Sequence, residues 1–314
     1  MSAKKRGLLI YNPIAGRFPS GILVSRAASV FTEQGWDIEV VQTYSGEHIT
    51  ELAHQAGSDA LDGLFVVGGD GSMNLAARGL LGSNTALGVL PAGTANVWAQ
   101  ELGLVGLNWT RMIALEESAR QLASAPAHWV DVGKINQTSF LLWAGIGLDG
   151  FIVNRIEPRG RWEKMFSMLH YSAASIWEAS FWHGMNLNVV VDGYQIQGHF
   201  LLALASNIHL YAGGLVNISP NALIDDGEMD LWLFKGEALI DAARTAWDLL
   251  YGRHVSSQQV LYMPFRELTV ESVTPAFFQV DGEPLNLEGK IDLQVCHRAL
   301  KVFIPENTPR LLFK

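Results

Sequence analysis

The segment Leu64-Phe65-Val66-Val67-Gly68-Gly69-Asp70-Gly71-Ser72-Met73-Asn74 passes from a short apolar strand through a glycine-rich turn into a helical pattern. The same succession recurs through the first 125 residues. Strands are expected at 8–11, 38–42, 64–67 and 86–90, and helices at 21–34, 47–56, 72–81 and from about 97 to 102. Strands that alternate with helices predict βαβ units and a parallel sheet covered on both faces.

The second half of the chain has a different pattern. Strands are expected at 129–135, 139–143, 187–191, 195–205, 229–234, 268–271, 277–280, 291–295 and 300–304, with helices at about 162–182 and 237–251. Turn pairs such as Asp192-Gly193 and Asp281-Gly282 favour antiparallel hairpins. We therefore expect an α/β domain over residues 1–125, joined by the tail 305–314, and an antiparallel β-sandwich domain over 126–304.

Composition excludes several classes of protein. The 314 residues are 49% hydrophobic and carry a formal net charge of −9 without a basic stripe, which argues against nucleic-acid binding. The single cysteine, Cys296, cannot form an internal disulfide or a cysteine-rich zinc site. No signal-peptide core and no run of 18 apolar residues is present, so a cytoplasmic location is expected.

Four loops follow the predicted parallel strands: Asn12–Arg17, Thr43–Gly46, Gly68–Ser72 and Pro91–Asn96. Ligands of parallel sheets bind beyond the carboxyl ends of the strands. Glycine allows close backbone approach, and the free N–H groups at a helix start attract phosphate. The sequence contains no G-x-x-x-x-G-K-[ST] pattern, so a P-loop NTPase is excluded.

Several acidic residues are candidates for chemistry. Asp70 inside a phosphate loop suits a Mg²⁺ ligand or a hydrogen-bonding residue, and the alternative is a turn that its carboxylate caps. Asp281 could accept a proton or simply form an Asp-Gly hairpin turn. The run from Asp225 to Asp230 could bind Mg²⁺ or Ca²⁺, or be a solvated acidic turn. Arg17 could clamp a phosphate or be an ordinary surface arginine.

The ordered motifs carry a resemblance. The stretches 68–74 and 90–96, the opening Asn12–Arg17 loop, Asp225-Asp226-Gly227 and Val280–Glu283 together resemble the diacylglycerol kinase catalytic-domain family, which includes bacterial diacylglycerol kinases, YegS-like lipid kinases, sphingosine kinases and ceramide kinases. The resemblance implies an N-terminal α/β domain like those of NAD kinase and phosphofructokinase, a C-terminal β-sandwich, and transfer of the ATP γ-phosphate to a lipid hydroxyl.

The resemblance also implies roles for individual residues. Asp281 would be the general base. The ATP site would use Asn12, Arg17, Thr43, Gly68, Gly69, Asp70, Gly71, Ser72, Asn74, Gly93, Thr94 and Asn96. A structural Mg²⁺ site would use the Asp226 side chain and lie close to Leu223 and Glu228. The family's second loop often reads Gly-Thr-x-Asn-Asp, whereas position 97 here is Val97, so a carboxylate of the metal network is missing.

Two further stretches of the sequence carry recognisable patterns. Gly145–Gly150 matches G-x-G-x-x-G, but it lies outside the βαβ half and no clean helix is expected after it, so we reject a dinucleotide site. The aromatic stretch 162–182, preceded by three arginines at 155, 159 and 161, could lie at a membrane interface or pack on the sandwich.

The sequence thus predicts an ATP- and Mg²⁺-dependent lipid kinase, a phosphotransferase of lipid and phospholipid metabolism, with diacylglycerol as the default acceptor. A sphingoid base or another lipid alcohol remains an alternative acceptor. The alternative functions are an NAD-kinase-like enzyme and a lipid- or nucleotide-binding protein without turnover. We expect a lipid partner at a membrane surface, reached as a peripheral protein, and leave open the association of two copies.

Overall fold

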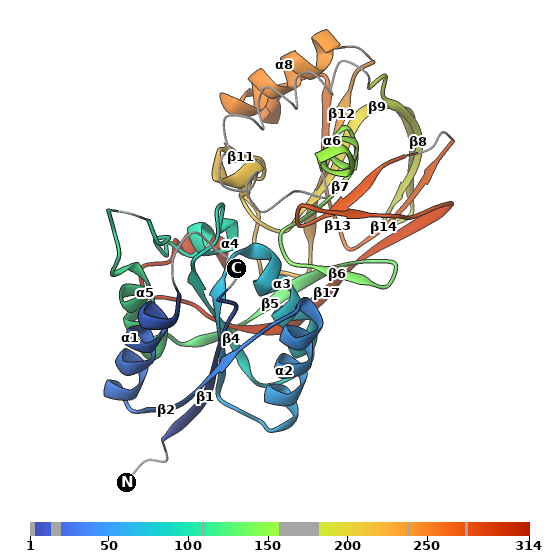
Figure 1. The fold of residues 1–314 in the computed structure, drawn as a ribbon. Coiled ribbons are helices and arrows are strands. Elements are labelled where there is room, and N and C mark those ends of the chain that lie inside the picture. Colours follow the sequence, from blue (N-terminus) through green and yellow to red (C-terminus); the bar gives the residue numbers. More distant parts are fainter. Residues whose placement is uncertain (1–3, 14–19, 109, 157–181, 238, 274–275) are drawn as a thin grey trace. The chain divides into compact units, whose positions relative to one another are not determined.

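The computed structural model describes residues 4–13, 20–108, 110–156, 182–237, 239–273 and 276–314 (Figure 1). The chain forms two compact units. Unit 1 contains Met1–Val130 and Arg298–Leu311, and unit 2 contains Asp131–His297 and Leu312–Lys314. We expected the domain boundary near residue 125, and the two units divide five residues later, after Val130. Part of the last long strand also belongs to unit 1, and the last three residues return to unit 2.

Unit 1 is built on parallel strands. Their order is β2-β1-β3-β4, and β4 also pairs in parallel with the end of β17 through Leu87 and Val302. The bounds are β1 Lys5–Tyr11, β2 Trp36–Gln42, β3 Gly63–Gly68, β4 Ala86–Pro91 and β17 Lys290–Phe303. Every residue of β3 and β4 is buried, as short apolar strands in a sheet covered on both faces should be. The parallel α/β architecture predicted from the sequence is therefore confirmed.

Helices cover both faces of the unit 1 strands. They are α1 Ser20–Glu33, α2 Gly46–Ser58, α3 Asp70–Leu80, α4 Val97–Glu101 and α5 Ala114–Ser124. Helix α1 packs with α5, and α2 packs with α3, on opposite sides of the strands (Figure 1). Aromatic rings fill one of the layers between strands and helices: the ring of Phe65 lies 5.1 Å from that of Trp36 and 5.2 Å from that of Phe303. Phe303 thus anchors the returning end of the chain in the core of unit 1.

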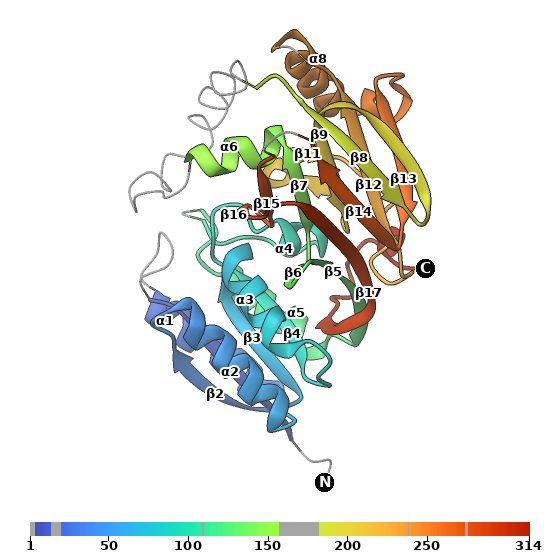
Figure 2. The ribbon, with the colours of Figure 1, turned by 90° about the vertical axis from the view of Figure 1, so that its right-hand side faces the viewer.

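Unit 2 is an antiparallel sheet domain. One run of neighbours is β16-β15-β7-β9-β8-β14-β17; β9 also pairs with β12, which pairs with β13, and β5 pairs with β6 (Figure 2). The bounds are β5 Ala127–Ile135, β6 Thr138–Phe140, β7 Trp143–Gly147, β8 Met185–Val191, β9 Tyr194–Ser206, β10 Leu210–Tyr211, β11 Val216–Asn217, β12 Met229–Lys235, β13 Val260–Phe265, β14 Glu267–Ser272, β15 Phe278–Val280 and β16 Glu283–Leu285. The expected antiparallel second domain is confirmed.

Helical elements of unit 2 complete the description. They are α6 Leu148–Ile156, α8 Leu239–Leu250 and the short 3₁₀ turns η2 Ala212–Gly214 and η3 Arg253–Ser256; a further turn, η4, covers Arg310–Leu312. The apolar core of unit 2 includes Phe200, Phe265 and Met185. Among the described residues, no helix is long and apolar enough to cross a membrane.

Several expectations for the second half need correction. The stretches 291–295 and 300–304 belong to one continuous strand, β17, which bends at Arg298, where φ is +49°. Strands β13 and β16 and the two-residue strands β10 and β11 were not expected, and the expected strand 139–143 is divided between β6 and the start of β7. Contrary to our prediction, a helix is present there: α6 begins at Leu148, inside the G-x-G-x-x-G match, but β7 pairs antiparallel with both β9 and β15. The match is therefore still outside any βαβ unit. The aromatic stretch expected at 162–182 lies outside the described residues except for Trp182.

Candidate functional site

The carboxyl ends of the first four strands lie at one edge of unit 1. Tyr11 at the end of β1 is in register with Gln42 of β2, and Gly68 of β3 is in register with Pro91 of β4. The backbone N–H of Thr43 donates to the Tyr11 carbonyl, at 2.7 Å. Because β2 and β3 lie on opposite sides of β1, the loops after β1 and β3 diverge at a topological switch point, where ligands of such sheets bind.

Two of the predicted loops touch each other through glycines. A Cβ on Gly93 would lie 2.5 Å from the Cα of Gly69, and a Cβ on Gly68 would lie 2.9 Å from the Cβ of Ser72. Neither Gly69 nor Gly93 has a positive φ, so close approach, rather than a left-handed backbone, requires glycine here. The turn from β3 into α3 and the turn from β4 into α4 therefore form one compact surface.

Asp70 joins these two turns. It is the first residue of α3, and its two carboxylate oxygens accept the backbone N–H groups of Val97, at 3.0 Å, and Trp98, at 3.1 Å. Those N–H groups belong to the start of α4, where helix geometry leaves donors without intrahelical partners. Burial raises the pKa of Asp70, and the backbone hydrogen bonds oppose that rise. Asp70 thus caps the start of α4, the helix after the neighbouring loop, and not the start of α3, the helix in which it lies.

Asn96 fixes the shape of the second turn. It has a left-handed backbone, with φ +55°, and its side chain both accepts from the Gly93 N–H at 2.8 Å and donates to the Gly93 carbonyl at 3.0 Å. Asn96 is buried, whereas Thr94 between these two residues is exposed. The asparagine therefore holds the loop closed on itself, and Thr94 is the residue of this turn that faces solvent.

Two predicted site residues carry buried polar atoms without a partner. The hydroxyl of Thr43, a residue with 1% exposure, and the side-chain carbonyl of Asn74, in the first turns of α3, make no hydrogen bond within the described part of the chain. A buried polar atom without a partner costs stability, so each such atom in a native fold calls for an explanation such as a ligand. Asn12 follows β1 and is half-buried, and Arg17 lies outside the described residues.

Asp281 forms the turn of the β15–β16 hairpin. Val280 pairs with Glu283, and the two residues between them, Asp281 and Gly282, both have positive φ, at +51° and +84°. This is the Asp-Gly hairpin turn that the sequence offered as the alternative. The carboxylate is also held in place, because its oxygens accept three backbone N–H groups, from residues 141, 142 and 143, at 2.8–3.0 Å. Glu283, the other carboxylate of the hairpin, is exposed.

A hydrogen-bonded group next to this hairpin was missed by sequence reasoning. The side-chain amide of Gln279 donates to Asp149 and its carbonyl accepts from the N–H of Gly282 at 2.8 Å. Burial raises the pKa of Asp149, and hydrogen bonds with Tyr211 and Gln279 oppose the rise; burial and the nearby Asp149 raise the pKa of Tyr211. The only signal for this group in the sequence was the glycine-rich match that contains Asp149.

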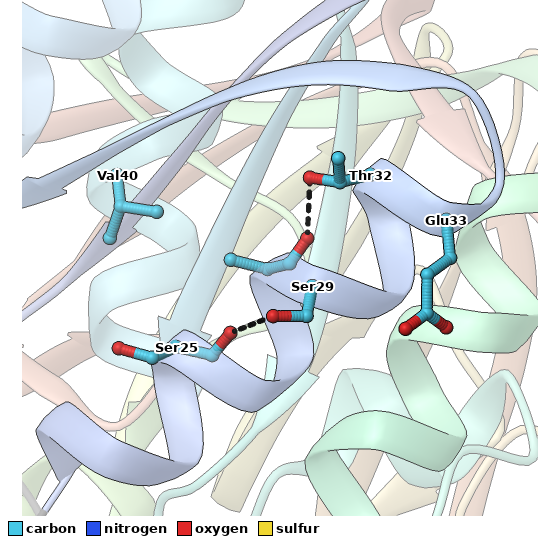
Figure 3. A pocket seen from close by; sticks show the side chains of 6 residues that line it. Ser25, Ser29, Thr32, Glu33 and Val40 are labelled. Atoms are coloured by element: carbon cyan, nitrogen blue, oxygen red, sulfur yellow. Dashed lines mark hydrogen bonds between the residues drawn. The ribbon is translucent and has the colours of Figure 1, made fainter.

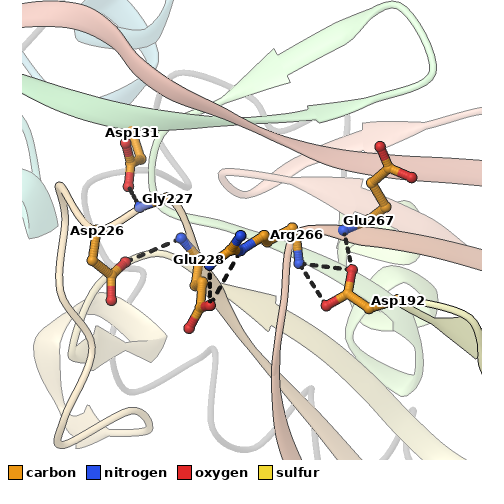
Figure 4. Close-up of polar contacts among 7 residues, drawn as sticks. All are labelled: Asp131, Asp192, Asp226, Gly227, Glu228, Arg266 and Glu267. Carbon is orange, nitrogen blue, oxygen red and sulfur yellow. Dashed lines mark hydrogen bonds and ion pairs between the residues drawn. The ribbon is translucent and has the colours of Figure 1, made fainter.

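The acidic turn after residue 224 is tied into unit 2 by charged groups (Figure 4). Buried Asp131 of β5 accepts the Gly227 N–H at 2.6 Å, and Asp226 accepts the Glu228 N–H at 3.0 Å. Glu228 pairs with Arg266 at 3.0 Å. Burial raises the pKa of Asp226, as do the negative charges of Glu228 and Asp131. Sequence reasoning missed Asp131, which lies between two buried valines in β5.

The turn does not form a closed carboxylate cage. Within the described ranges, no group of three or more His, Cys, Asp or Glu side chains is placed to hold a metal ion. Of the three residues predicted for the Mg²⁺ site, Leu223 has no side-chain oxygen and Glu228 is paired with Arg266. The Asp226 carboxylate is therefore the side chain expected to hold the cation. Asp226 shares its surroundings with two other carboxylates, so an added cation would relieve the repulsion that raises its pKa.

A surface hollow on unit 1 is not a candidate site. It is lined by one side of α1 and by Val40 of β2 (Figure 3). Its hydroxyls are already satisfied within the helix, since Ser29 donates to the Ser25 carbonyl and Thr32 to the Ala28 carbonyl. None of the predicted loop residues lines it.

Comparison with known proteins agrees with this architecture. The family model of the diacylglycerol kinase catalytic domain matches residues 6–135, and that of the YegS C-terminal NAD kinase beta sandwich-like domain matches residues 144–304. The diacylglycerol kinase of Bacillus subtilis is 25% identical over 281 residues, which cover 89% of this chain and 90% of the relative. A protein of Alcanivorax borkumensis named "Probable lipid kinase YegS-like" is 25% identical over 315 residues, with 98% and 99% coverage.

Solved structures show the same fold. A diacylglycerol kinase from Bacillus anthracis superposes with a TM-score of 0.73 at 19% identity, covering 98% of this chain and all of that one. An NAD kinase from Archaeoglobus fulgidus, solved in complex with ATP, gives a TM-score of 0.52 at 11% identity, covering 98% and 96% of the two chains. The fold and the ordered loops define a kinase of the α/β plus β-sandwich class. The chain belongs to the diacylglycerol kinase and YegS-like lipid kinase family.

Proposed function

We propose that the protein is an ATP- and Mg²⁺-dependent lipid kinase that transfers the γ-phosphate of ATP to a lipid hydroxyl, with diacylglycerol as acceptor and phosphatidic acid as product. The observation that carries the proposal is the pair of touching glycine turns at the carboxyl edge of the parallel sheet. Thr43, at the same edge after β2, has a buried hydroxyl without a partner among the described residues, and Asn74 of α3 has a buried side-chain carbonyl without one. The names of the relatives supply the lipid acceptor.

The start of α3 suits the phosphates of ATP. Asp70, Gly71 and Ser72 occupy its first turn, where backbone N–H groups lack intrahelical partners and the helix dipole favours negative charge. Gly71 is exposed and carries no side chain that would hinder a ligand. In this proposal Thr43 donates its free hydroxyl to a phosphate oxygen. Asn12, Arg17, Thr94 and Asn96 belong to the flanking loops of the same site. ATP bound to the A. fulgidus neighbour of the same fold supports ATP as the donor.

The acidic turn is the proposed Mg²⁺ site. The Asp226 carboxylate would hold the cation close to Leu223 and Glu228. Oxygen donors and surplus negative charge are what Mg²⁺ requires of a protein site. The bound cation would stabilise the turn in which Asp131 holds the Gly227 N–H.

Asp281 is the proposed general base. In the transfer, the base takes the proton of the acceptor hydroxyl, the lipid oxygen bonds to the γ-phosphorus, and the bond to the β-phosphate oxygen breaks to leave ADP. Three backbone N–H groups orient the Asp281 carboxylate. Exposed Glu283, two residues further along, is the other carboxylate of the hairpin, and it must be tested beside Asp281.

The test is transfer of ³²P from labelled ATP with Mg²⁺ to diacylglycerol, a sphingoid base and ceramide in mixed vesicles, with NAD as a separate acceptor. The proposal expects label in diacylglycerol that Asp281→Ala abolishes. Label in NAD would identify an NAD-kinase-like enzyme. Bound ATP with no labelled acceptor would indicate a binding protein.

Asp281→Ala needs a control for folding, because it removes the acceptor of three N–H groups. Glu283→Gln provides a second variant in the same hairpin, and circular dichroism checks both. If Glu283→Gln abolishes transfer and a folded Asp281 variant retains it, the assignment of the base to Asp281 is wrong while the kinase proposal stands.

A further inference from the structure

Helix α8 presents an apolar stripe to solvent. Ile240 is 74% exposed, and four more large side chains on α8 and the turn after it are more than half exposed: Trp247, Leu250, Tyr251 and Val255. The opposite side of α8 carries buried Ala242 and Leu249 and packs on η3 and β11. The helix is therefore apolar on two sides, only one of which is used by the core.

The exposed residues form one continuous surface. Trp247 follows Ile240 by seven residues, and Tyr251 follows Trp247 by four and donates its N–H to the Trp247 carbonyl, so these three residues lie on the same side of the helical turns. Leu250, three residues after Trp247, lies on the neighbouring flank. The Trp247 and Tyr251 rings lie 4.5 Å apart. Single exposed apolar residues are ordinary, but a stripe of large apolar and aromatic side chains marks an interaction surface. We call these four residues with Val255 the α8 stripe.

The charges beside the stripe are unlike those of the whole chain. The protein carries a net charge of −9, yet Arg244 on α8 and Arg253 in η3 are both exposed, and the Arg253 guanidinium lies over the Tyr251 ring at 5.9 Å. The two acidic residues of α8 are half-buried, and Asp241 is engaged in accepting the Glu237 N–H at 3.0 Å. Cationic groups thus accompany the apolar side chains at the exposed edge, and the local charge is close to balanced.

We propose that the α8 stripe docks on the surface of a phospholipid bilayer, with its apolar side chains at the acyl boundary and Arg244 and Arg253 at the lipid phosphates. Tryptophan and tyrosine favour this interface because one part of each ring system is apolar and another can hydrogen-bond. Amphipathic helices with arginine beside the apolar face bind in this manner.

The choice of a bilayer as the partner of the α8 stripe follows from the proposed function, on which this inference rests. A kinase acting on a bilayer lipid must reach the membrane, and the described residues contain no helix able to span it. A surface contact is therefore the remaining route for the described part of the chain. Because the local charge is nearly balanced, apolar insertion should dominate, and binding should depend only weakly on anionic lipid and on salt.

The experiment compares the full-length wild type with Trp247→Glu/Leu250→Glu. The matched control is Tyr194→Glu/Val273→Glu, which adds the same charge at positions of unit 2 that are 78% and 80% exposed. Co-sedimentation with phosphatidylcholine vesicles, with and without phosphatidylglycerol, measures binding. We expect at least about tenfold weaker partitioning for the α8 variant and no more than about a twofold change for the control. Equal binding of all three proteins would overturn the proposal.

Two further readouts separate the outcomes. Transfer of ³²P to a short-chain diacylglycerol, dissolved as monomers, should be unchanged in the α8 variant, while transfer to long-chain diacylglycerol in vesicles should fall with binding. If the wild type labels no lipid but its vesicle binding still depends on the stripe, the proposed function fails and the docking surface stands. Sedimentation velocity without lipid tests whether the α8 stripe instead binds a second copy of the chain. If the wild type and the control are dimers and the α8 variant is a monomer, the stripe is a dimer interface and membrane docking is refuted.

Discussion

Replacing Asp70 by alanine should loosen the start of α4. The Asp70 oxygens accept the N–H groups of Val97 and Trp98, two residues that are each 2% exposed, so water cannot readily replace the lost acceptor. Loss of a helix cap costs about 0.5–2 kcal/mol, and loss of hydrogen bonds to a charged group costs about 1.5–3 kcal/mol. For the two bonds together we expect a local destabilisation of about 2–4 kcal/mol, which corresponds to roughly 30- to 1000-fold in the opening equilibrium.

Hydrogen exchange resolves this effect because it reports on individual segments of a two-unit chain. In Asp70→Ala, exchange at the amides of Val97 and Trp98 should accelerate by the factor above, and ATP-dependent protection of the β3–α3 turn should weaken. Asp62→Ala is the matched control, since exposed Asp62 accepts one backbone N–H, from Arg6, at 2.7 Å. Exchange at 97–98 within about threefold of the wild type would refute the view that Asp70 holds the two turns together.

Three other predictions concern the turns and unit 2. Gly93→Ala should cost about 2 kcal/mol or more in urea unfolding, because its Cβ would meet the Gly69 backbone at 2.5 Å; Gly21→Ala, with nothing within 4 Å, should be neutral or slightly stabilising, and equal effects would contradict the close-contact argument. Thr43→Val should leave the unliganded protein as stable or up to about 1 kcal/mol more stable, yet raise the ATP KM by about tenfold, and an unchanged KM would remove Thr43 from the site. Asp149→Asn tests linkage: since the folded pKa of Asp149 is raised, the native state holds this proton more tightly than the unfolded state, and the wild type should lose stability relative to the variant as pH rises from about 4 through the folded pKa. Urea unfolding at a series of pH values measures this difference. If the wild type instead gains stability relative to the variant over that pH range, the pKa of Asp149 is not raised by folding.

The architecture of unit 1 was predictable because its signals are local. Strands β1, β3 and β4 contain short apolar runs that are followed by loops containing glycine or polar residues, and this pattern identifies each strand and the turn after it. The helix start at Asp70 and the strand end at Gly68 lie within two residues of the positions expected. Because the strands are parallel, their carboxyl ends meet at one edge of the sheet. The sequence could therefore predict that candidate residues from four separate loops lie at that edge.

The partners of the side chains were not predictable, because they depend on contacts between distant segments. Asp70 finds its donors 27 and 28 residues away, and Asp281 finds its donors almost 140 residues away. Asp131 was overlooked because a single acidic residue within a predicted strand has no local signature. Strand β17 looked like two strands because the residues around Arg298 are polar and partly exposed, and the backbone there is left-handed.

The departure from the family pattern at position 97 can be interpreted from these contacts. Val97 contributes only its backbone N–H to Asp70, and its side chain is buried in unit 1. The link between the two glycine turns is therefore independent of the side chain at 97, and valine preserves it while adding apolar burial at the start of α4. A carboxylate at this position would instead place a second negative charge beside the buried Asp70 carboxylate, at a cost that a bound cation would have to offset. We therefore expect Val97 to act through the local charge available to a cation, and not through the geometry of the two glycine turns, to which the proposed function assigns the phosphates.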